Sequence, residues 1–135
     1  MTARETKIRE ESKSVAKDYL KKASDNYDQM LAAVHASNWN ATSTLAIQCA
    51  ISSADAICVQ EKGMRSISHD HLDVCDLVAK LPLGEAGEKA KQLRKIIIRK
   101  NMVQYESRNT YKSDADEMLK VTARFYQWVK EIMDK

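Results

Sequence analysis

Residues 41–62 read ATSTLAIQCAISSADAICVQEK, a long run that contains neither glycine nor proline. Side chains three and four positions apart share one side of a helix. In this run they form a narrow face of small and apolar residues: Leu45, Ala46, Cys49, Ala50, Ser53, Ala54 and Ile57. Small side chains allow a second helix to pack closely, and Gly63 provides a typical helix end. The run therefore predicts a long helix that packs tightly within a helical fold.

The rest of the chain shows helical periodicity on both sides of this run. An earlier helix is predicted over residues 15–35, and a shorter one over residues 71–81, before the helix-breaking sequence LPLG. Two more helices are predicted at about residues 85–108 and 113–133. The expected fold is all-α, an up-and-down bundle of about five helices.

The composition agrees with one all-α domain. The chain has 135 residues, which is enough for one domain with its own core. Hydrophobic residues make up 44%, and only 3 glycines and 1 proline interrupt the helical runs. We expect a single domain over residues 15–135. A charged segment, residues 1–14, is expected to precede it as a solvated helical lead-in or a frayed tail.

Cysteine usage and hydropathy predict a cytoplasmic protein. The 3 cysteines are odd in number and lack CxxC spacing, which favours free thiols in a reducing compartment. Residues 1–11 are charged and lack the apolar segment of a signal peptide. No run approaches the roughly 20 apolar residues that a membrane span needs, so we expect no membrane association. The formal net charge of +3 is too small to identify a partner.

The helix predicted over residues 85–108 carries polar side chains within its apolar face. Lys100 and Gln104 fall among the apolar residues of that face, which are Leu93, Ile96, Ile97 and Val103. A second apolar strip lies on roughly the opposite side and contains Ile98, Met102 and Tyr105. The helix is therefore expected to contact its own bundle and another surface. Because an unpaired buried ammonium group is costly, this stretch predicts a buried or interfacial polar site.

Four features, taken in chain order, resemble one family of small helical domains. They are the helix over residues 19–34, the alanine-rich helix over 46–58 that closes in Lys62-Gly63, the SHDH segment at 68–71, and the KNMVQY segment at 100–105. With these features the chain resembles the HEPN (higher eukaryote and prokaryote nucleotide-binding) superfamily over roughly residues 17–133. The resemblance implies an all-α helical bundle.

The resemblance also implies a site and partners. Many HEPN proteins are ribonucleases or nucleotide-linked toxins that carry an Arg, then Asn or another polar residue, and a His a few positions later. In that family, the motifs of two subunits line a cleft at a homodimer interface. The proteins themselves often occur beside a minimal nucleotidyltransferase. In this chain the Arg position falls on Lys100, the polar position on Asn101 and the His position on Tyr105. A homodimer and a nucleotidyltransferase partner, as in a toxin–antitoxin pair, are therefore implied.

These substitutions predict that the usual ribonuclease motif is absent. Cleavage through a 2′-hydroxyl needs a proton acceptor near neutral pH, and tyrosine has an ordinary pKa of about 10. Lysine can face a phosphate but lacks the bidentate fork of arginine. We expect a nucleotide- or RNA-binding site formed by Lys100, Asn101, Gln104 and Tyr105, in which Tyr105 offers a stacking face. No cofactor or metal is predicted.

An alternative from another functional class stays open. The same four side chains could form a polar seam that is satisfied across a dimer interface. The protein would then be a helical interaction or scaffold protein that keeps the fold and has lost the site. The two hypotheses differ in whether Lys100 and Tyr105 are open to solvent or sealed.

The most basic stretch of the chain lies on the same predicted helix. Lys91, Lys95 and Arg99 are spaced by four and form one continuous ridge. Such a ridge can follow a nucleic-acid backbone, although it is also typical of a solvated helix face. We treat these residues as a candidate surface for contact with the phosphates of RNA or DNA.

A histidine-containing cluster occupies the connector before the helix predicted at residues 71–81. It contains His69, Asp70, His71, Asp73, Cys75 and Asp76. These residues scatter around a helix start, so we expect no metal site and interpret Asp70 as the helix N-cap. Arg65 and His71 also match an Arg-x5-His spacing. We interpret that match as coincidental and expect these side chains not to share the cleft, because the family motif lies on the fourth helix. An active ribonuclease that uses His69 or His71 remains a third hypothesis.

Overall fold

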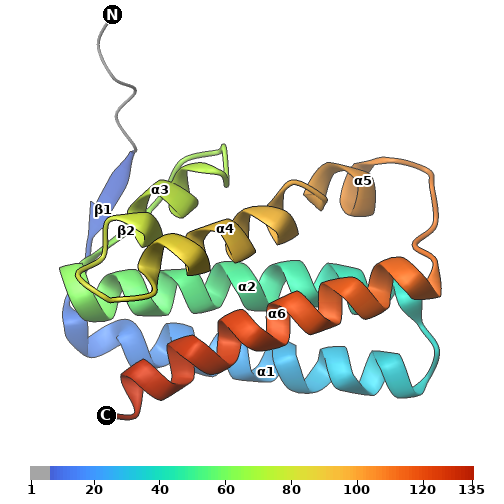
Figure 1. The fold of residues 1–135 in the computed structure, drawn as a ribbon, viewed down its shortest axis with the longest axis horizontal. Coiled ribbons are helices and arrows are strands. Elements are labelled where there is room, and N and C mark those ends of the chain that lie inside the picture. Colours follow the sequence, from blue (N-terminus) through green and yellow to red (C-terminus); the bar gives the residue numbers. More distant parts are fainter. Residues whose placement is uncertain (1–6) are drawn as a thin grey trace, which may run out of the picture.

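The computed structural model describes residues 7–135, which form six α-helices and a two-stranded ribbon (Figure 1). The helices are α1 (Ala16–His35), α2 (Trp39–Lys62), α3 (Asp73–Ala79), α4 (Ala86–Ile97), α5 (Lys100–Tyr105) and α6 (Lys112–Met133). The other elements are strands β1 (Ile8–Glu10) and β2 (Met64–Ser66) and the 3-10 helix η1 (Lys13–Val15). The all-α fold class predicted from helical periodicity is confirmed.

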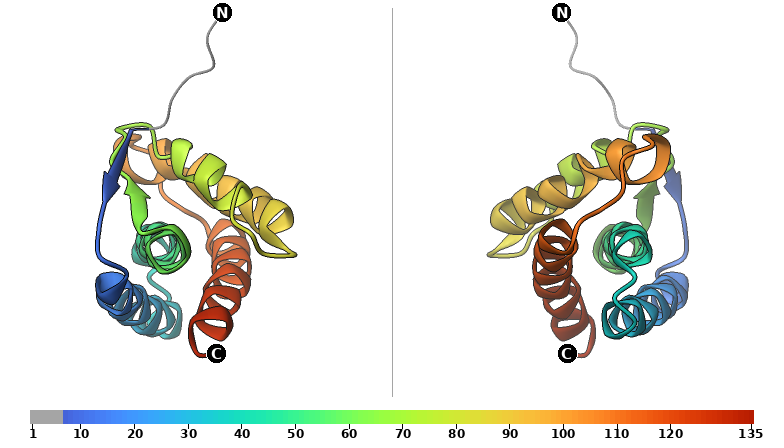
Figure 2. Two further views of the ribbon diagram at one scale, coloured as in Figure 1. Left: turned by 90° about the vertical axis from the view of Figure 1, so that its left-hand side faces the viewer. Right: turned by 90° about the vertical axis from the view of Figure 1, so that its right-hand side faces the viewer.

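α2 is the central helix of the bundle. α1 and α6 pack against it, and α3 and α4 cover the remaining side, as the end-on views show (Figure 2). The helices α1, α2, α4 and α6 alternate in direction along the chain (Figure 1). The largest fully buried side chains include Met30, Ile47, Ile57, Leu93 and Phe125. α2 is long and apolar enough to cross a membrane, but 72% of its apolar window is buried in the bundle, as expected for a core helix.

Both ends of α2 are set by local chemistry. The Asn38 side-chain oxygen accepts a hydrogen bond from the Ala41 backbone N–H at 3.2 Å, which caps the first turn. Gly63 ends the helix with a left-handed φ of 64°, a conformation that glycine adopts without a steric penalty. The Gly63 carbonyl then accepts a hydrogen bond of 2.9 Å from the Glu11 backbone N–H. This contact holds the segment between β1 and η1 against the end of α2.

The N-terminal segment differs from the expected helical lead-in or tail. β1 pairs antiparallel with β2, with Ile8 opposite Ser66. The Ile67 backbone N–H extends the ribbon by donating to the Lys7 carbonyl at 3.0 Å. Strands of three residues are too short to show a period in the sequence, so this pairing could not be recognised there. Residues 1–6 of the predicted segment lie outside the described residues.

The single helix expected over residues 85–108 is divided into α4 and α5. α4 ends at Ile97, and the Arg99 backbone N–H bonds to the Ile96 carbonyl at 3.2 Å in a tight turn. α5 then begins at Lys100. The predicted inner face is buried on α4, and Ile98, from the second apolar strip, is 57% exposed in the turn. After the turn only part of the packed face continues, because Val103 on α5 is partly buried against the core.

Candidate functional site

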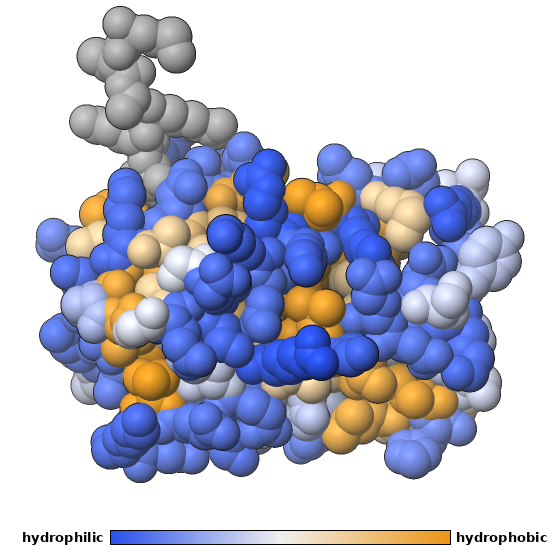
Figure 3. Space-filling model, in the orientation of Figure 1, coloured by the Kyte–Doolittle hydropathy of each residue, from blue (hydrophilic) through white to orange (hydrophobic). Residues whose placement is uncertain are grey.

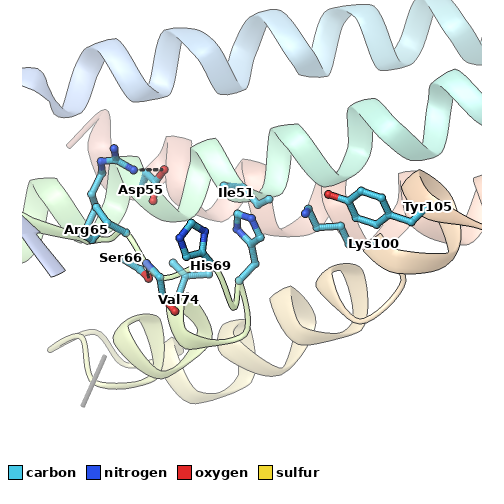
Figure 4. Close-up of a pocket in the computed structure, with 11 residues that line it drawn as sticks. Ile51, Asp55, Arg65, Ser66, His69, Val74, Lys100 and Tyr105 are labelled. Carbon is cyan, nitrogen blue, oxygen red and sulfur yellow. Dashed lines mark hydrogen bonds and ion pairs between the residues drawn. The ribbon is translucent and has the colours of Figure 1, made fainter. Parts of the chain in front are cut away.

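A half-open cavity of about 560 Å³ lies between α2, the β2–α3 connector and α5 (Figure 4). Small-ligand sites typically have volumes of about 300–1,000 Å³. Its polar lining consists of Asp55, Arg65, Ser66, Ser68, His69, His71, Lys100 and Tyr105. Figure 4 shows Arg65 and Asp55 at one end of the cavity, Lys100 and Tyr105 at the other, and His69 between them. Three segments that are distant in sequence therefore build one site.

Lys100 and Tyr105 are the sequence-predicted site residues that line this cavity. Lys100 is half-buried, and its Nζ atom lies 5.3 Å from the centroid of the Tyr105 ring, within the range of a cation–π contact. Tyr105 is 72% exposed. In the single chain, these groups are therefore open to solvent rather than sealed inside a polar seam.

Asn101 and Gln104, which were expected beside them, occupy different positions. Asn101 is exposed and lines an adjoining hollow of about 290 Å³ together with His69 and His71. Gln104 is half-buried and lines neither the cavity nor this hollow. All four residues belong to α5, and successive side chains of a helix point about 100° apart, so Asn101 and Gln104 point away from the cavity that Lys100 lines.

An ion pair between Asp55 and Arg65 forms one end of the cavity. Asp55 projects from the middle of α2 and is 8% exposed, and its Oδ2 atom lies 3.7 Å from Arg65 Nη1. Burial raises the pKa of the Asp55 carboxyl from 3.8 to about 7, although the positive charge of Arg65 opposes the shift. The carboxyl group is therefore poised to gain or lose a proton near neutral pH.

The Arg65 guanidinium is held by contacts that leave its hydrogen-bonding capacity largely unused. Its Nε atom lies 3.7 Å from Glu11 Oε2, and its Cζ atom lies 5.4 Å from the centroid of the Tyr19 ring. The distances to Asp55 and Glu11 both exceed hydrogen-bond length. Within residues 7–135 the buried Nε has no hydrogen-bond partner. An arginine carries five N–H donors, so this group can accept an anionic ligand from the cavity.

The histidine segment lies in the same cavity, contrary to the sequence interpretation. Arg65 and His71 line the cavity together with Lys100 and Tyr105, so the expectation that they would not share a cleft was wrong. The physical reason is that the β2–α3 connector crosses α2 toward α5. Burial and then the charge of Lys100 lower the pKa of His71 below its usual 6.5. His71 is therefore mainly neutral at pH 7 and able to accept a proton.

Hydrogen bonds within the connector hold this segment in place. Ser68 Oγ donates to Asp73 Oδ2 at 2.6 Å, and Asp70 Oδ1 accepts from the Leu72 backbone N–H at 3.0 Å. Asp70 was predicted to be the N-cap of this helix. The N-cap of α3 is Leu72 instead, and Asp70 orders the turn before the helix. In the described part of the chain, no group of three or more His, Cys, Asp or Glu side chains is arranged to hold a metal ion.

The basic ridge of Lys91, Lys95 and Arg99 lies outside the cavity. Lys91 Nζ is 3.4 Å from Glu88 Oε1, and Arg99 Nη2 is 3.1 Å from Glu117 Oε2 on α6. Lys95 is exposed on α4. The face that carries α4 and α6 is hydrophilic over most of its area (Figure 3). Acidic neighbours therefore offset two of the three ridge charges, which weakens the ridge as a surface for phosphate contact.

Comparison with known families matches residues 16–132 to the HEPN domain. The chain belongs to the HEPN family. The match covers most of the chain and the whole helical bundle, which confirms the resemblance found in the sequence. HEPN membership identifies the chain, at the level of the family, as a nucleotide- or RNA-related module. Comparisons with curated proteins and with solved structures give no match.

Sequence reasoning missed Asp55 and misjudged Arg65 as parts of this site. Asp55 is the only charged residue between Asn38 and Glu61, and an isolated charge in an apolar helix is a signal that could have been used. Arg65 did give a signal, its Arg-x5-His spacing with His71, but that match was interpreted as coincidental, because the pairing of β1 with β2 that positions Arg65 could not be recognised in the sequence.

Proposed function

We propose that this HEPN domain binds the phosphate of a nucleotide or of RNA in the cavity between α2 and α5. The observation that carries the proposal is the convergence of two cations, Arg65 from β2 and Lys100 from α5, on one cavity. His69 and His71 line the same space and can donate hydrogen bonds to phosphate oxygens. Burial raises the pKa of Asp55 to about 7, so its carboxyl group carries only part of its negative charge at neutral pH and repels an anion less than an ordinary aspartate would.

The exposed ring of Tyr105 supports a nucleotide as the ligand. Bases stack on aromatic side chains with a gain of about 1–3 kcal/mol. Tyr105 is 72% exposed at the edge of the cavity, and Lys100 lies over the ring. A base on the open side of the ring would place its phosphate near the two cations. Asn101, in the adjoining hollow, is available to bind the ribose.

We propose binding without the usual HEPN ribonuclease chemistry. Lys100 and Tyr105 stand where the family motif has Arg and His. Tyrosine is a poor proton acceptor at neutral pH, and lysine contacts phosphate as a point charge without the fork of arginine. The residues at the family positions can therefore hold an anion but do not supply a general base.

A specific observation favours RNA cleavage as a second candidate function. Two imidazoles, His69 and His71, line the cavity, and the lowered pKa of His71 leaves it able to accept a proton. If His71 takes the proton of a 2′-hydroxyl, cleavage would not require Tyr105. Substitution of both histidines by alanine would remove such cleavage and would leave any contaminating ribonuclease unchanged.

We further propose a cytoplasmic homodimer that works with a nucleotidyltransferase in a toxin–antitoxin-like pair. Two features support parts of this proposal. Ile98 and Tyr105 expose apolar surface beside the cavity, where a second copy could cover it. Cys49, Cys58 and Cys75 are buried and free, in agreement with a reducing compartment. Light scattering after gel filtration would detect the dimer, and co-purification from the native host would detect the partner.

The direct test is equilibrium binding of adenosine 5′-monophosphate and of a fluorescent single-stranded RNA at low and high salt. We expect salt-sensitive binding that Lys100→Ala reduces by about tenfold, because one charged phosphate contact is typically worth about 1.4 kcal/mol or more. The slope of affinity against salt should fall by about 0.7 for the lost contact with single-stranded RNA. Lys120→Ala is the matched control, because it removes an exposed lysine of α6 that does not line the cavity.

The outcomes separate the functional classes. Equal losses of affinity in Lys100→Ala and Lys120→Ala would show that binding is a general charge effect. That result would overturn the assignment of the cavity as the phosphate site. Binding of neither ligand by a folded wild-type protein would favour the scaffold hypothesis. Cleavage of the RNA that is lost in the double histidine variant would replace the non-catalytic proposal by the second candidate.

A further inference from the structure

A second hollow lies on the other side of the Asp55–Arg65 ion pair. It has a volume of about 500 Å³ and opens between α1 and α2. The two cavities share Ile51, Asp55 and Arg65 in their linings. The Asp55–Arg65 ion pair therefore lies at the boundary between two adjoining cavities. Each space, by its volume, can hold a ligand of about nucleotide size.

The charge balance of the second cavity differs from that of the first. Lys22 and Asp25, from neighbouring turns of α1, both line it, and their charges offset one another. The pair Asp55 and Arg65 adds at most a partial positive charge, because the raised pKa of Asp55, about 7, leaves its carboxyl group partly ionised. A phosphate group therefore has less to gain in this space than beside Lys100. A neutral ligand with several hydrogen-bonding edges fits it better.

The second cavity carries the side chains that such a ligand needs. Asn26 from α1 and Gln48 from α2 face it, and each amide offers both donors and an acceptor. Ser52 adds a hydroxyl group. The edges of a nucleobase present the same mixture of donors and acceptors, which is how side-chain amides recognise bases.

Arg65 occupies the boundary between the two spaces. Its guanidinium lies 3.7 Å from each of its carboxylate neighbours, Asp55 and Glu11, and its buried Nε has no hydrogen-bond partner within residues 7–135. A guanidinium fork fits a phosphate with two parallel hydrogen bonds. The group is therefore placed where a phosphate that joins the contents of the two cavities would lie.

We propose that the natural ligand is a single strand of at least two nucleotides that spans both cavities. One nucleotide lies against Lys100 and Tyr105, the linking phosphodiester lies against Arg65, and the base of the next nucleotide lies between Asn26 and Gln48. This inference rests on the proposed function, because it extends the same phosphate site. It specifies an oligonucleotide, in place of a mononucleotide, as the class of ligand.

The test compares adenosine 5′-monophosphate with the RNA dinucleotide pApA, which carries the same 5′-phosphate, by calorimetric titration of the full chain. We expect pApA to bind wild type at least about tenfold more tightly than the mononucleotide. In Asn26→Ala/Gln48→Ala this advantage should disappear, whereas the affinity for the mononucleotide should stay unchanged. Alanine is a strong helix former, so both helices should persist, which circular dichroism will verify.

Gln29→Ala/Gln127→Ala is the matched control, because it removes two exposed amides from α1 and α6 outside both cavities. If the control variant also loses the advantage, or if Asn26→Ala/Gln48→Ala keeps it, the second cavity does not hold the base. Equal affinities of wild type for the two ligands, both weakened by Lys100→Ala, would overturn the dinucleotide inference and leave the proposed function intact. A wild-type protein that binds neither ligand would overturn both.

Discussion

The two faces of α2 are built from opposite kinds of side chain. The core face presents Ala46, Ala50 and Ala54, which are fully buried against the rest of the bundle. The cavity face presents Ile51 and Asp55, and the Asp55 charge meets Arg65 only at ion-pair distance. Close packing of apolar groups stabilises a fold, whereas a buried ion pair seldom repays its desolvation. The difference suggests that the core face serves stability and the cavity face serves binding.

The largest expected effect on stability comes from removing an aromatic ring of the core, and it is compared with removal of a ring at the cavity. Phe125 is fully buried, and Tyr105 is 72% exposed. We expect Phe125→Ala to lower the free energy of unfolding by about 3–5 kcal/mol. Tyr105→Ala should change it by less than about 1 kcal/mol and weaken nucleotide binding instead. Urea unfolding measures the first quantity and ligand titration the second. Similar losses of stability in both variants would break the distinction between the two faces.

A second prediction uses the pH dependence of stability to sharpen the contrast. The pKa of Asp55 rises from 3.8 to about 7, through burial first and the nearby Glu11 charge, against the opposing charges of Arg65 and Lys22. The folded protein therefore holds a proton that the unfolded chain releases. The resulting stability is fully present below pH 4 and is lost as pH rises through 7, at no more than about 1.4 kcal/mol per pH unit.

Urea unfolding of wild type and Asp55→Asn between pH 5 and pH 8 measures this contribution. The lowered pKa of His71 acts in the opposite sense, but both proteins contain His71, so their difference isolates Asp55. We expect the stability of Asp55→Asn, relative to wild type, to increase with pH. A constant difference across this range would show that the carboxyl group does not titrate there.

Smaller changes in stability, opposite in sign to each other, are expected when two glycines are replaced by alanine. Gly63 has a left-handed φ of 64°, and a Cβ there would meet the Glu11 carbonyl oxygen at 3.4 Å. Gly63→Ala should therefore cost about 1–2 kcal/mol of stability. Gly87 lies within α4, and a Cβ there would have no neighbour within 4 Å, so Gly87→Ala should stabilise the protein by about 0.5–1 kcal/mol. Thermal unfolding would reveal whether the two changes indeed differ in sign.

The smallest effect is expected on the basic ridge. Lys91→Ala/Lys95→Ala removes two charges from α4, one of them already paired with Glu88. Exposed ion pairs contribute about 0–1 kcal/mol, so stability should hardly change. RNA affinity should fall less than in Lys100→Ala. A larger loss of affinity than Lys100→Ala, with a steeper fall in the salt slope, would move the binding surface from the cavity to the ridge.

Helical periodicity predicted the long elements because it is a local property. α1, α2 and α6 each show apolar side chains at helical spacing, and Gly63 marked the end of α2 correctly. The end of α4 was missed, since no glycine or proline stands near Ile97. Helix ends that no such residue marks are the least predictable from sequence.

The candidate site could be predicted only in part. Lys100 and Tyr105 were found because they occupy the positions of a family motif. Gln104 lies in the same helix, α5, but does not line the cavity, and the side of α5 that faces the cavity is set by packing that the sequence does not show. The interpretation of His71 failed because its distance along the chain from the fourth predicted helix was taken as distance in space, whereas His71 and Lys100 line the same cavity.

The residue pattern alone was sufficient for the long helices α1, α2 and α6 and for the fold class, because helical periodicity depends on spacings of a few residues, and the order of short features along the chain was sufficient for the family. The cavity required the folded chain. Asp55, Arg65 and Lys100 belong to different elements, and they meet only because a three-residue ribbon holds β2 beside α2 and a turn redirects α5. Contacts between distant segments depend on the packing of the whole bundle, and no local period in a sequence encodes them.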